Sequence, residues 1–182
     1  MNGKTMTTAM CAAVLASLTL AFGCGGDVSR EIARSGFDVE TEIWADAPTV
    51  AVDDVAPHEG AGSLNVFADG RLRVPFMDAP VSDVVGDSLT VTLWARTEVM
   101  QRPVILEMIL DRAEGDPRLV QVSLERVERT TPWSFVQAAF DVLPDETPTR
   151  VRLALVVPEP GRIWIDDVTV WDGVAASPAR SE

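Results

Sequence analysis

The chain has no tyrosine, a single lysine, a single histidine and two cysteines, and each shortage excludes a class of chemistry. Lys4 is the only lysine, and 28 acidic residues outnumber 15 basic ones. No basic stripe exists to neutralise phosphates, so we expect no nucleic-acid partner. His58 lies in a glycine-rich turn without a fixed serine or cysteine partner, and is expected to be a turn residue with a satisfied side chain. Because zinc spacings, phosphate loops and dinucleotide motifs are also lacking, we expect that the protein is not an enzyme.

The first 24 residues have the pattern of an export signal. Lys4 precedes an apolar stretch, Ala9–Phe22, that is too short to span a bilayer. The stretch ends in Ala21-Phe22-Gly23-Cys24, which resembles the bacterial lipobox. That resemblance implies cleavage after residue 23 and acylation of Cys24. Cys11 lies inside the signal, so no intramolecular disulfide is left, and acylation explains a lone cysteine in an oxidising compartment. The alternative is an ordinary secretory signal that leaves a free thiol.

A lipid anchor at Cys24 predicts a cell-envelope location, with secretion as the alternative. Several acyl chains anchor firmly, because each buried CH₂ contributes about 0.8 kcal/mol. Gly25 follows the cysteine where, in the lipoprotein family, an aspartate implies retention at the inner membrane. The outer membrane is therefore favoured.

The rest of the chain alternates apolar and polar residues, as half-buried strands do. Ser88–Arg96 directs Leu89, Val91, Leu93 and Ala95 to one face and Thr90, Thr92, Trp94 and Arg96 to the other. About ten such segments, separated by turn signals such as Asp69-Gly70 and Glu159-Pro160-Gly161, predict an all-β, antiparallel β-sandwich. We expect a signal over residues 1–23, a tether over 24–35 with one helical turn at Glu31–Arg34, the sandwich over 36–172 and a disordered tail over 173–182.

Five segments, in order, resemble the jelly-roll carbohydrate-binding modules of families 4, 9, 16 and 22, within the galactose-binding-like superfamily. The segments are Gly36-Phe37-Asp38 with Trp44, His58 to Val66, Gly86 to Arg96, Thr131-Pro132-Trp133 with Phe135 and Phe140, and Arg162 to Val168. The resemblance implies a jelly roll and places Trp44 and Trp133 in its core. The same superfamily also contains protein-docking and structural modules, so the fold alone does not imply sugar binding.

The paired acids Asp166-Asp167 close the last strand, and both cannot lie unpaired in the core. The family resemblance implies a structural calcium held by Asp38, by Asp166 or Asp167, and by carbonyl groups near Ala61 and Gly62. Calcium needs six to eight oxygen ligands. The alternative is a solvated acid pair at the end of a strand.

Glycan binding requires an exposed aromatic face flanked by hydrogen-bonding groups. Thr92, Trp94 and Arg96 share one face of a strand, and Glu107 with Gln121 or Ser123 on neighbouring strands would extend that face. Alternatively, Trp94 packs under a loop and Arg96 pairs with an acid, since tryptophan is more often buried than displayed. Trp164 and Trp171 can lie on either face of the last strand.

We therefore expect a monomeric, membrane-anchored lipoprotein with a non-catalytic module that binds glycan by aromatic stacking and hydrogen bonds. The alternative is a structural or protein-docking lipoprotein that uses the same jelly roll without sugar, with another cell-envelope protein as its partner.

Overall fold

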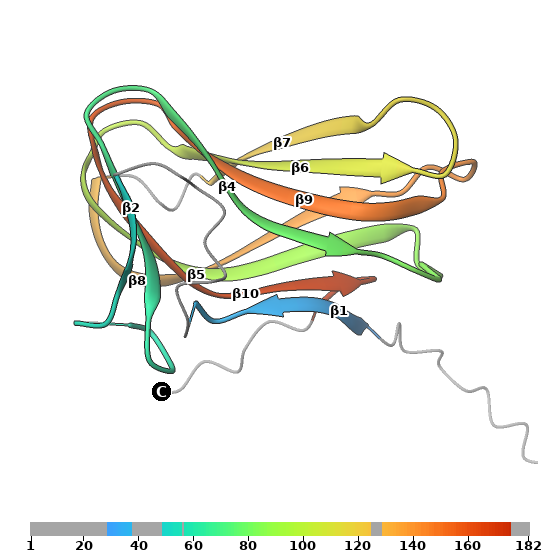
Figure 1. Ribbon diagram of the computed structural model, residues 1–182, viewed down its shortest axis with the longest axis horizontal. Helices are drawn as coiled ribbons and strands as arrows, with labels where there is room; N and C mark the ends of the chain where they lie inside the picture. The colour runs from blue at the N-terminus through green and yellow to red at the C-terminus, as the bar shows by residue number, and fades with distance from the viewer. Residues whose placement is uncertain (1–28, 38–48, 56, 125–128, 176–182) are drawn as a thin grey trace, which may run out of the picture.

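The computed structural model describes residues 29–37, 49–55, 57–124 and 129–175, without the side chains of residues 129 and 130. Within these residues the chain forms ten strands and no helix. The strands make two antiparallel sheets, stacked face to face (Figure 1). The predicted antiparallel β-sandwich is confirmed.

The six-stranded sheet has the order β2-β3-β10-β5-β8, and β1 also pairs with β10. Its strands are β1 (Arg30–Ser35), β2 (Val50–Asp53), β3 (Ser63–Ala68), β5 (Ser88–Met100), β8 (Arg129–Asp141) and β10 (Gly161–Asp172). The four-stranded sheet has the order β4-β9-β6-β7. Its strands are β4 (Leu72–Pro80), β6 (Val104–Arg112), β7 (Arg118–Leu124) and β9 (Pro148–Val157).

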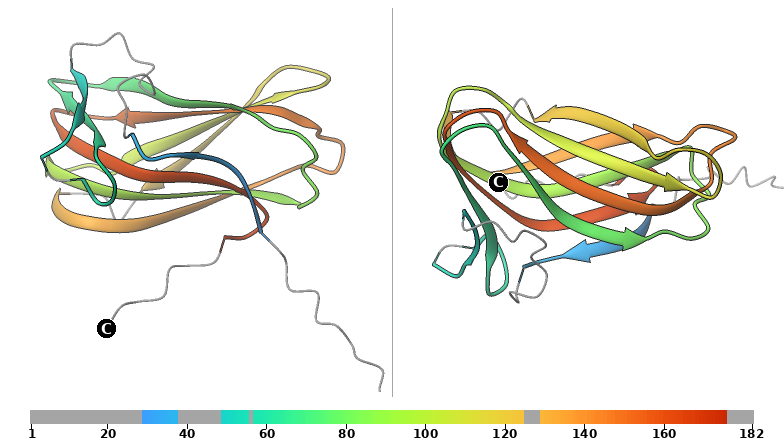
Figure 2. Two further views of the ribbon diagram at one scale, coloured as in Figure 1. Left: turned by 60° about the horizontal axis from the view of Figure 1, so that its bottom comes forward. Right: turned by 45° about the horizontal axis from the view of Figure 1, so that its top comes forward.

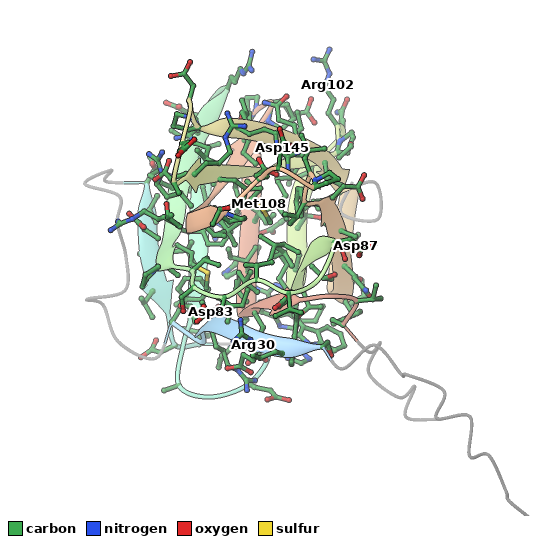
Figure 3. The ribbon with its side chains drawn as sticks, turned by 90° about the vertical axis from the view of Figure 1, so that its right-hand side faces the viewer. Arg30, Asp83, Asp87, Arg102, Met108 and Asp145 are labelled. Atoms are coloured by element: carbon green, nitrogen blue, oxygen red, sulfur yellow. The ribbon has the colours of Figure 1, made fainter. Side chains whose placement is uncertain are left out.

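The core lies between the two sheets, where the apolar member of each alternating pair points inward (Figure 3). On β5 these are Leu89, Val91, Leu93 and Ala95, all at most 1% exposed. Facing them from the four-stranded sheet are the alternate residues of β6 and β9: Val104, Leu106, Met108, Leu110, Val151, Leu153, Leu155 and Val157. The period of two therefore decides which β5 side chains remain for the outer face.

A bulge in β10 changes which residues face outward along the strand. The pairing of β10 with β5 shifts between Asp166 and Thr169, and Asp167 takes a left-handed φ of 49°. Ile163 and Ile165 are in the core before the bulge, and Val168 and Val170 are in the core after it. The extra residue lets Trp164, Asp166, Thr169 and Trp171 all lie on the outer face, which strict alternation forbids.

The tether is shorter than expected, because Arg30–Ser35 is strand β1. It pairs antiparallel with the second half of β10, from Arg30 opposite Asp172 to Ser35 opposite Val168 (Figure 2). Arg30 lies beside Asp83 (Figure 3) and donates to the carbonyls of Ser82 and Asp83 at 3.0 and 2.8 Å. The expected helical turn at Glu31–Arg34 is therefore wrong, and the sandwich begins before Gly36.

The far end of the sandwich also extends beyond the expected boundary at Asp172. Gly173 donates its N–H to the Ser88 carbonyl at 2.9 Å, and Ala175 is 4% exposed and accepts from the Gln137 side chain. Residues 173–175 are thus part of the folded unit rather than of a tail. The predictions for the signal at 1–23, Cys24, Trp44 and the tail after 175 lie outside the described residues. In the part of the chain that is described, no helix is long and apolar enough to cross a membrane.

Candidate functional site

Three predicted ligand residues lie together on the outer face of the six-stranded sheet. Thr92, Trp94 and Arg96 alternate with the core residues of β5, as expected. In the sheet register Trp94 lies opposite Asp166 on β10 and opposite Phe135 on β8. The predicted shared face of β5 is confirmed.

Trp94 is only partly available to a ligand. The His58 ring lies nearly parallel to the indole, with centroids 3.9 Å apart and planes at 17°. Phe135 meets the indole at an angle of 65°, with centroids 5.6 Å apart. One face of the Trp94 indole is therefore covered by the protein itself, and the remainder forms part of a wall.

Asp166 fixes the turn that places His58 against Trp94. Its side chain is 0% exposed, and Oδ2 accepts the backbone N–H groups of His58 and Glu59 at 2.9 and 3.1 Å. Oδ1 accepts the N–H of Asp167 at 2.8 Å. Burial raises the pKa of Asp166, even though the three hydrogen bonds favour the ionised form. We read Asp166 as the anchor of the His58-Glu59 turn.

Asp167, the bulge residue, points its carboxylate toward two nitrogen groups. Oδ2 lies 3.1 Å from Nδ1 of His58, and Oδ1 lies 3.5 Å from Nη2 of Arg34 on β1. The left-handed backbone of Asp167 and the pairing of β1 with β10 together bring these three side chains to one place. His58 is the turn residue with a satisfied side chain that the sequence predicts.

Trp94, Phe135 and Asp167 border a hollow of about 300 Å³ on the outer face of the six-stranded sheet. Its lining combines aromatic rings with charged and hydroxyl groups: Glu31, Arg34, Glu59, Thr92, Trp94, Phe135, Asp167, Thr169 and Trp171. We call it the β5 hollow. Trp171 donates from Nε1 to Oγ1 of Thr92 at 2.9 Å, which holds both side chains in place.

A second hollow, of about 350 Å³, adjoins the β5 hollow. It is lined by Gly36 and Gly60 together with Arg34, Glu59 and Asp167, and these last three residues also line the first hollow. A ligand in the β5 hollow could therefore continue past Glu59 along the edge of β1. Both hollows have volumes in the range of ordinary small-molecule sites.

Arg96 does not line either hollow. Its guanidinium carbon lies 4.0 Å from the ring centre of Trp164 and 5.7 Å from that of Trp133. This stacking arrangement is a cation–π contact within the protein. The placement also corrects the expectation for Trp133, which is half-buried on the outer face and not in the core.

Glu107 and Gln121 lie on the other sheet and do not extend the β5 face. They face each other on β6 and β7, where Gln121 donates to Glu107 at 2.6 Å. Nε of Arg73, on β4, also lies 2.6 Å from a Glu107 oxygen. The expectation of one continuous site with Trp94 is wrong, because the chain crosses between the sheets after β5, and the core separates the two groups.

The described residues contain only part of the expected calcium site. Asp38 lies outside them, and both oxygens of Asp166 accept backbone N–H groups. Asp167 is paired with His58 and Arg34. His58, Glu59 and Asp167 do offer ligand atoms within 4.8 Å of one another, but a set with an imidazole nitrogen suits transition metals rather than calcium. These residues do not provide the six to eight oxygens that calcium requires.

Sequence reasoning missed most of the lining of the β5 hollow. Glu31 and Arg34 fall in the segment that the sequence predicts to be a tether. The position of Glu59 depends on the hydrogen bond from its N–H to Asp166, which the sequence does not reveal. Phe135 and Trp171 were detectable as aromatic residues on strands, but their face depends on register and on the β10 bulge. The signal for Phe135 was its position two residues after Trp133 on the same strand.

No protein-family model matches the sequence, and no curated protein matches it either. Solved structures do resemble the fold. The C-terminal family 22 carbohydrate-binding module of Clostridium thermocellum Xyn10B is 12% identical, with a TM-score of 0.54, covering 81% of this chain and 96% of that one. A family 30 carbohydrate-binding module is 13% identical, with a TM-score of 0.53, covering 85% and 93%.

The fold is not confined to free-standing modules. The enzymatically active domain of bacteriophage CBA120 tailspike protein 4 matches at 13% identity and a TM-score of 0.53, covering 78% of this chain but 19% of that one. The chain thus has the jelly-roll fold of carbohydrate-binding modules, as the sequence motifs predict. At these identities the similarity establishes the fold alone.

Proposed function

We propose that the protein is a non-catalytic glycan-binding module whose ligand occupies the β5 hollow. The observation that carries the proposal is the lining of that hollow, where Trp94, Phe135 and Trp171 surround polar groups from β1, β5, β10 and the His58-Glu59 turn. Pyranose C–H faces pack on aromatic rings, and the flanking polar groups can hydrogen-bond the hydroxyls. The jelly-roll fold shared with carbohydrate-binding modules supports the same function.

The proposed mechanism is binding without bond cleavage. Thr92, held by Trp171, offers a hydroxyl beside the Trp94 indole. Glu31, Glu59 and Arg34 reach the hollow from its outer side and can orient a sugar by its hydroxyls. The protein would present this face from the cell envelope, anchored through an acylated Cys24 or released by an ordinary secretory signal.

Substitution of Trp94 tests the proposal. Because Trp94 forms a wall of the hollow, we expect Trp94→Ala to weaken retention of the protein on its glycan by about tenfold or more, equivalent to about 1.4 kcal/mol. The measurement is a glycan-array screen followed by titration calorimetry of the best ligand. Phe67→Ala is the matched control, because Phe67 is aromatic, 48% exposed and outside the hollow. Equal binding by Trp94→Ala and the parent protein would place the glycan elsewhere.

A structural or protein-docking role is the second candidate. It is favoured by an apolar hollow of about 460 Å³ between Phe67, Val99 and Pro160, away from Trp94. Val99 is 70% exposed and adopts a left-handed φ of 61°, which is unusual for a β-branched residue. If no glycan is retained, and Trp94→Ala lowers the melting temperature sharply, this role is the better one.

Calcium binding by Asp38 with Asp166 or Asp167 stays a prediction. Thermal melts with and without EDTA test it. A fall in melting temperature on chelation supports a structural ion, and identical melts speak against one.

A further inference from the structure

The β5 hollow has an excess of negative charge among its lining residues. Glu31, Glu59 and Asp167 contribute carboxylates, and Arg34 is the single arginine in the lining. Nη2 of Arg34 lies 3.5 Å from Oδ1 of Asp167, so these two charges largely offset each other. His58 lies on the other oxygen of Asp167, at 3.1 Å, and adds positive charge only when protonated.

Within the described part of the chain, Glu31 and Glu59 have no cationic partner. Both side chains are exposed, and among the described residues neither forms an ion pair. The backbone N–H of Glu59 donates to the buried Asp166, which fixes the Glu59 backbone where the two hollows meet. A ligand that spans the junction therefore passes an unpaired carboxylate.

The aromatic walls of the hollow also favour a positively charged ligand. Trp94, Phe135 and Trp171 line the hollow together with the acids. The electron-rich faces of such rings attract ammonium groups as well as pyranose C–H groups. The formal net charge of −13 for the whole chain also attracts cations and repels uronates and sulfated sugars.

We infer that the glycan bound in the β5 hollow carries free amino groups, as oligomers of glucosamine do. This inference rests on the proposed glycan-binding function. One amino sugar would lie against the aromatic wall, and the ammonium group of that unit or of the next would face Glu59 at the junction. Acetylated or neutral sugars of the same length lack this charge and would bind more weakly.

Titration calorimetry with three tetrasaccharides tests the inference: a glucosamine oligomer, its fully N-acetylated form and a glucose oligomer. At about pH 6 and low salt we expect the glucosamine oligomer to bind at least about fivefold tighter than the other two, as one or two exposed ion pairs imply. Glu59→Gln should remove most of that preference, because it weakens binding of the charged glucosamine oligomer far more than binding of the two neutral oligomers.

Glu98→Gln is the control for the general negative charge of the protein, because Glu98 is an exposed acid that lines neither the β5 hollow nor its neighbour. It should keep the preference. Equal affinity for all three oligomers, with each lost in Trp94→Ala, would overturn the inference and keep the proposed function. A preference that survives Glu59→Gln would overturn the contact between the ammonium group and Glu59. If none of the three oligomers binds, the result counts against both the proposed glycan-binding function and the preference for amino sugars.

Discussion

Arg96 is predicted from the sequence to bind ligand, but in the structure it makes cation–π contacts within the protein. It lies on the outer face near Trp94, but its guanidinium carbon is 4.0 Å from the ring centre of Trp164 and 5.7 Å from that of Trp133. The contact joins β10, β5 and β8 across the six-stranded sheet. Arginine is suited to this place because its flat, weakly hydrated head stacks on aromatic rings.

We expect Arg96→Ala to lower the free energy of unfolding by about 1–2 kcal/mol through loss of the cation–π contacts. Glycan affinity should stay within about twofold, since Arg96 does not line the hollow. Urea denaturation and calorimetry measure the two effects. Arg71→Ala removes an exposed arginine elsewhere and should change neither. Tenfold weaker binding with unchanged stability would restore the ligand role that the sequence suggests.

Asp166, unlike Arg96, supports the site from below, because it is buried beneath the His58-Glu59 turn. Its carboxylate holds the N–H groups of His58, Glu59 and Asp167. Replacing it by alanine leaves these donors without their acceptor, so we expect Asp166→Ala to cost about 1–3 kcal/mol of stability. Binding should weaken as well, because Glu59 is released from the junction. A variant that is destabilised but binds normally would show that the turn does not form the site.

At the scale of elements, the buried ion pair between Arg118 and Glu146 joins β7 to the turn before β9. The Glu146 side chain is 0% exposed and lies 2.6 Å from Nη2 of Arg118, while its other oxygen accepts from Nε at 2.8 Å. The Leu143 N–H donates to Glu146 at 3.1 Å. The hydrogen bonds and charge of Arg118 lower the pKa of Glu146.

This ion pair predicts a pH dependence of stability. Because the pKa of Glu146 is lower in the folded chain, the unfolded chain takes up the proton first as pH falls. The contribution is therefore complete above the ordinary value of 4.5 and is lost as pH falls through the folded pKa. We expect Glu146→Gln to be less stable than the parent at pH 7 by about 1–3 kcal/mol, with the difference shrinking below pH ~4.5. Glu114→Gln, an exposed acid nearby, should show no such difference. A stability difference that is as large at pH 3 as at pH 7 would contradict this pH dependence.

Removal of strand β1 is expected to lower the stability of the sandwich. Ile32 and Ala33 pack against the core, and Glu31 and Arg34 line the hollow. A chain that starts at Gly36 lacks all four, so we expect it to lose about 2 kcal/mol relative to a chain that starts at Ser29, chiefly from the uncovered Ile32. Thermal unfolding of the two chains compares them. Identical melting temperatures would mean that β1 adds nothing to the sandwich.

The alternation of apolar and polar residues predicts the strands and their inward faces, but it does not predict which strands lie side by side in a sheet. The inward row of β5 and its outward partners follow from a period of two. The separation of Glu107 from Trp94 does not, because sheet order depends on where the chain crosses between layers. The lining contributed by Trp171 depends on one extra residue at Asp167, and the charged hexapeptide of β1 becomes a strand only through pairing with β10. Both features are set by non-local contacts.

At the scale of the whole molecule, the two outer faces of the sandwich differ in chemistry. The six-stranded sheet presents Trp94, Phe135 and Trp171 on its outer row, whereas Trp164 in the same row is only 4% exposed and has Arg96 on its ring. On the four-stranded sheet, Arg73, Glu107 and Gln121 instead satisfy one another. The aromatic face therefore offers the rings that sugar stacking needs, and the polar face offers groups that are already paired.

The most direct test of the glycan site is a nitrogen–proton NMR titration of the tryptophan indole N–H signals with the glucosamine tetrasaccharide. Trp94 and Trp171 line the β5 hollow, whereas Trp133 and Trp164 lie on the same face around Arg96. We expect the indole signals of Trp94 and Trp171 to move with a common affinity, while those of Trp133 and Trp164 stay nearly still. Shifts of the backbone N–H signals of Glu107 and Gln121 on the opposite sheet, with the Trp94 and Trp171 indole signals unchanged, would contradict the proposed site.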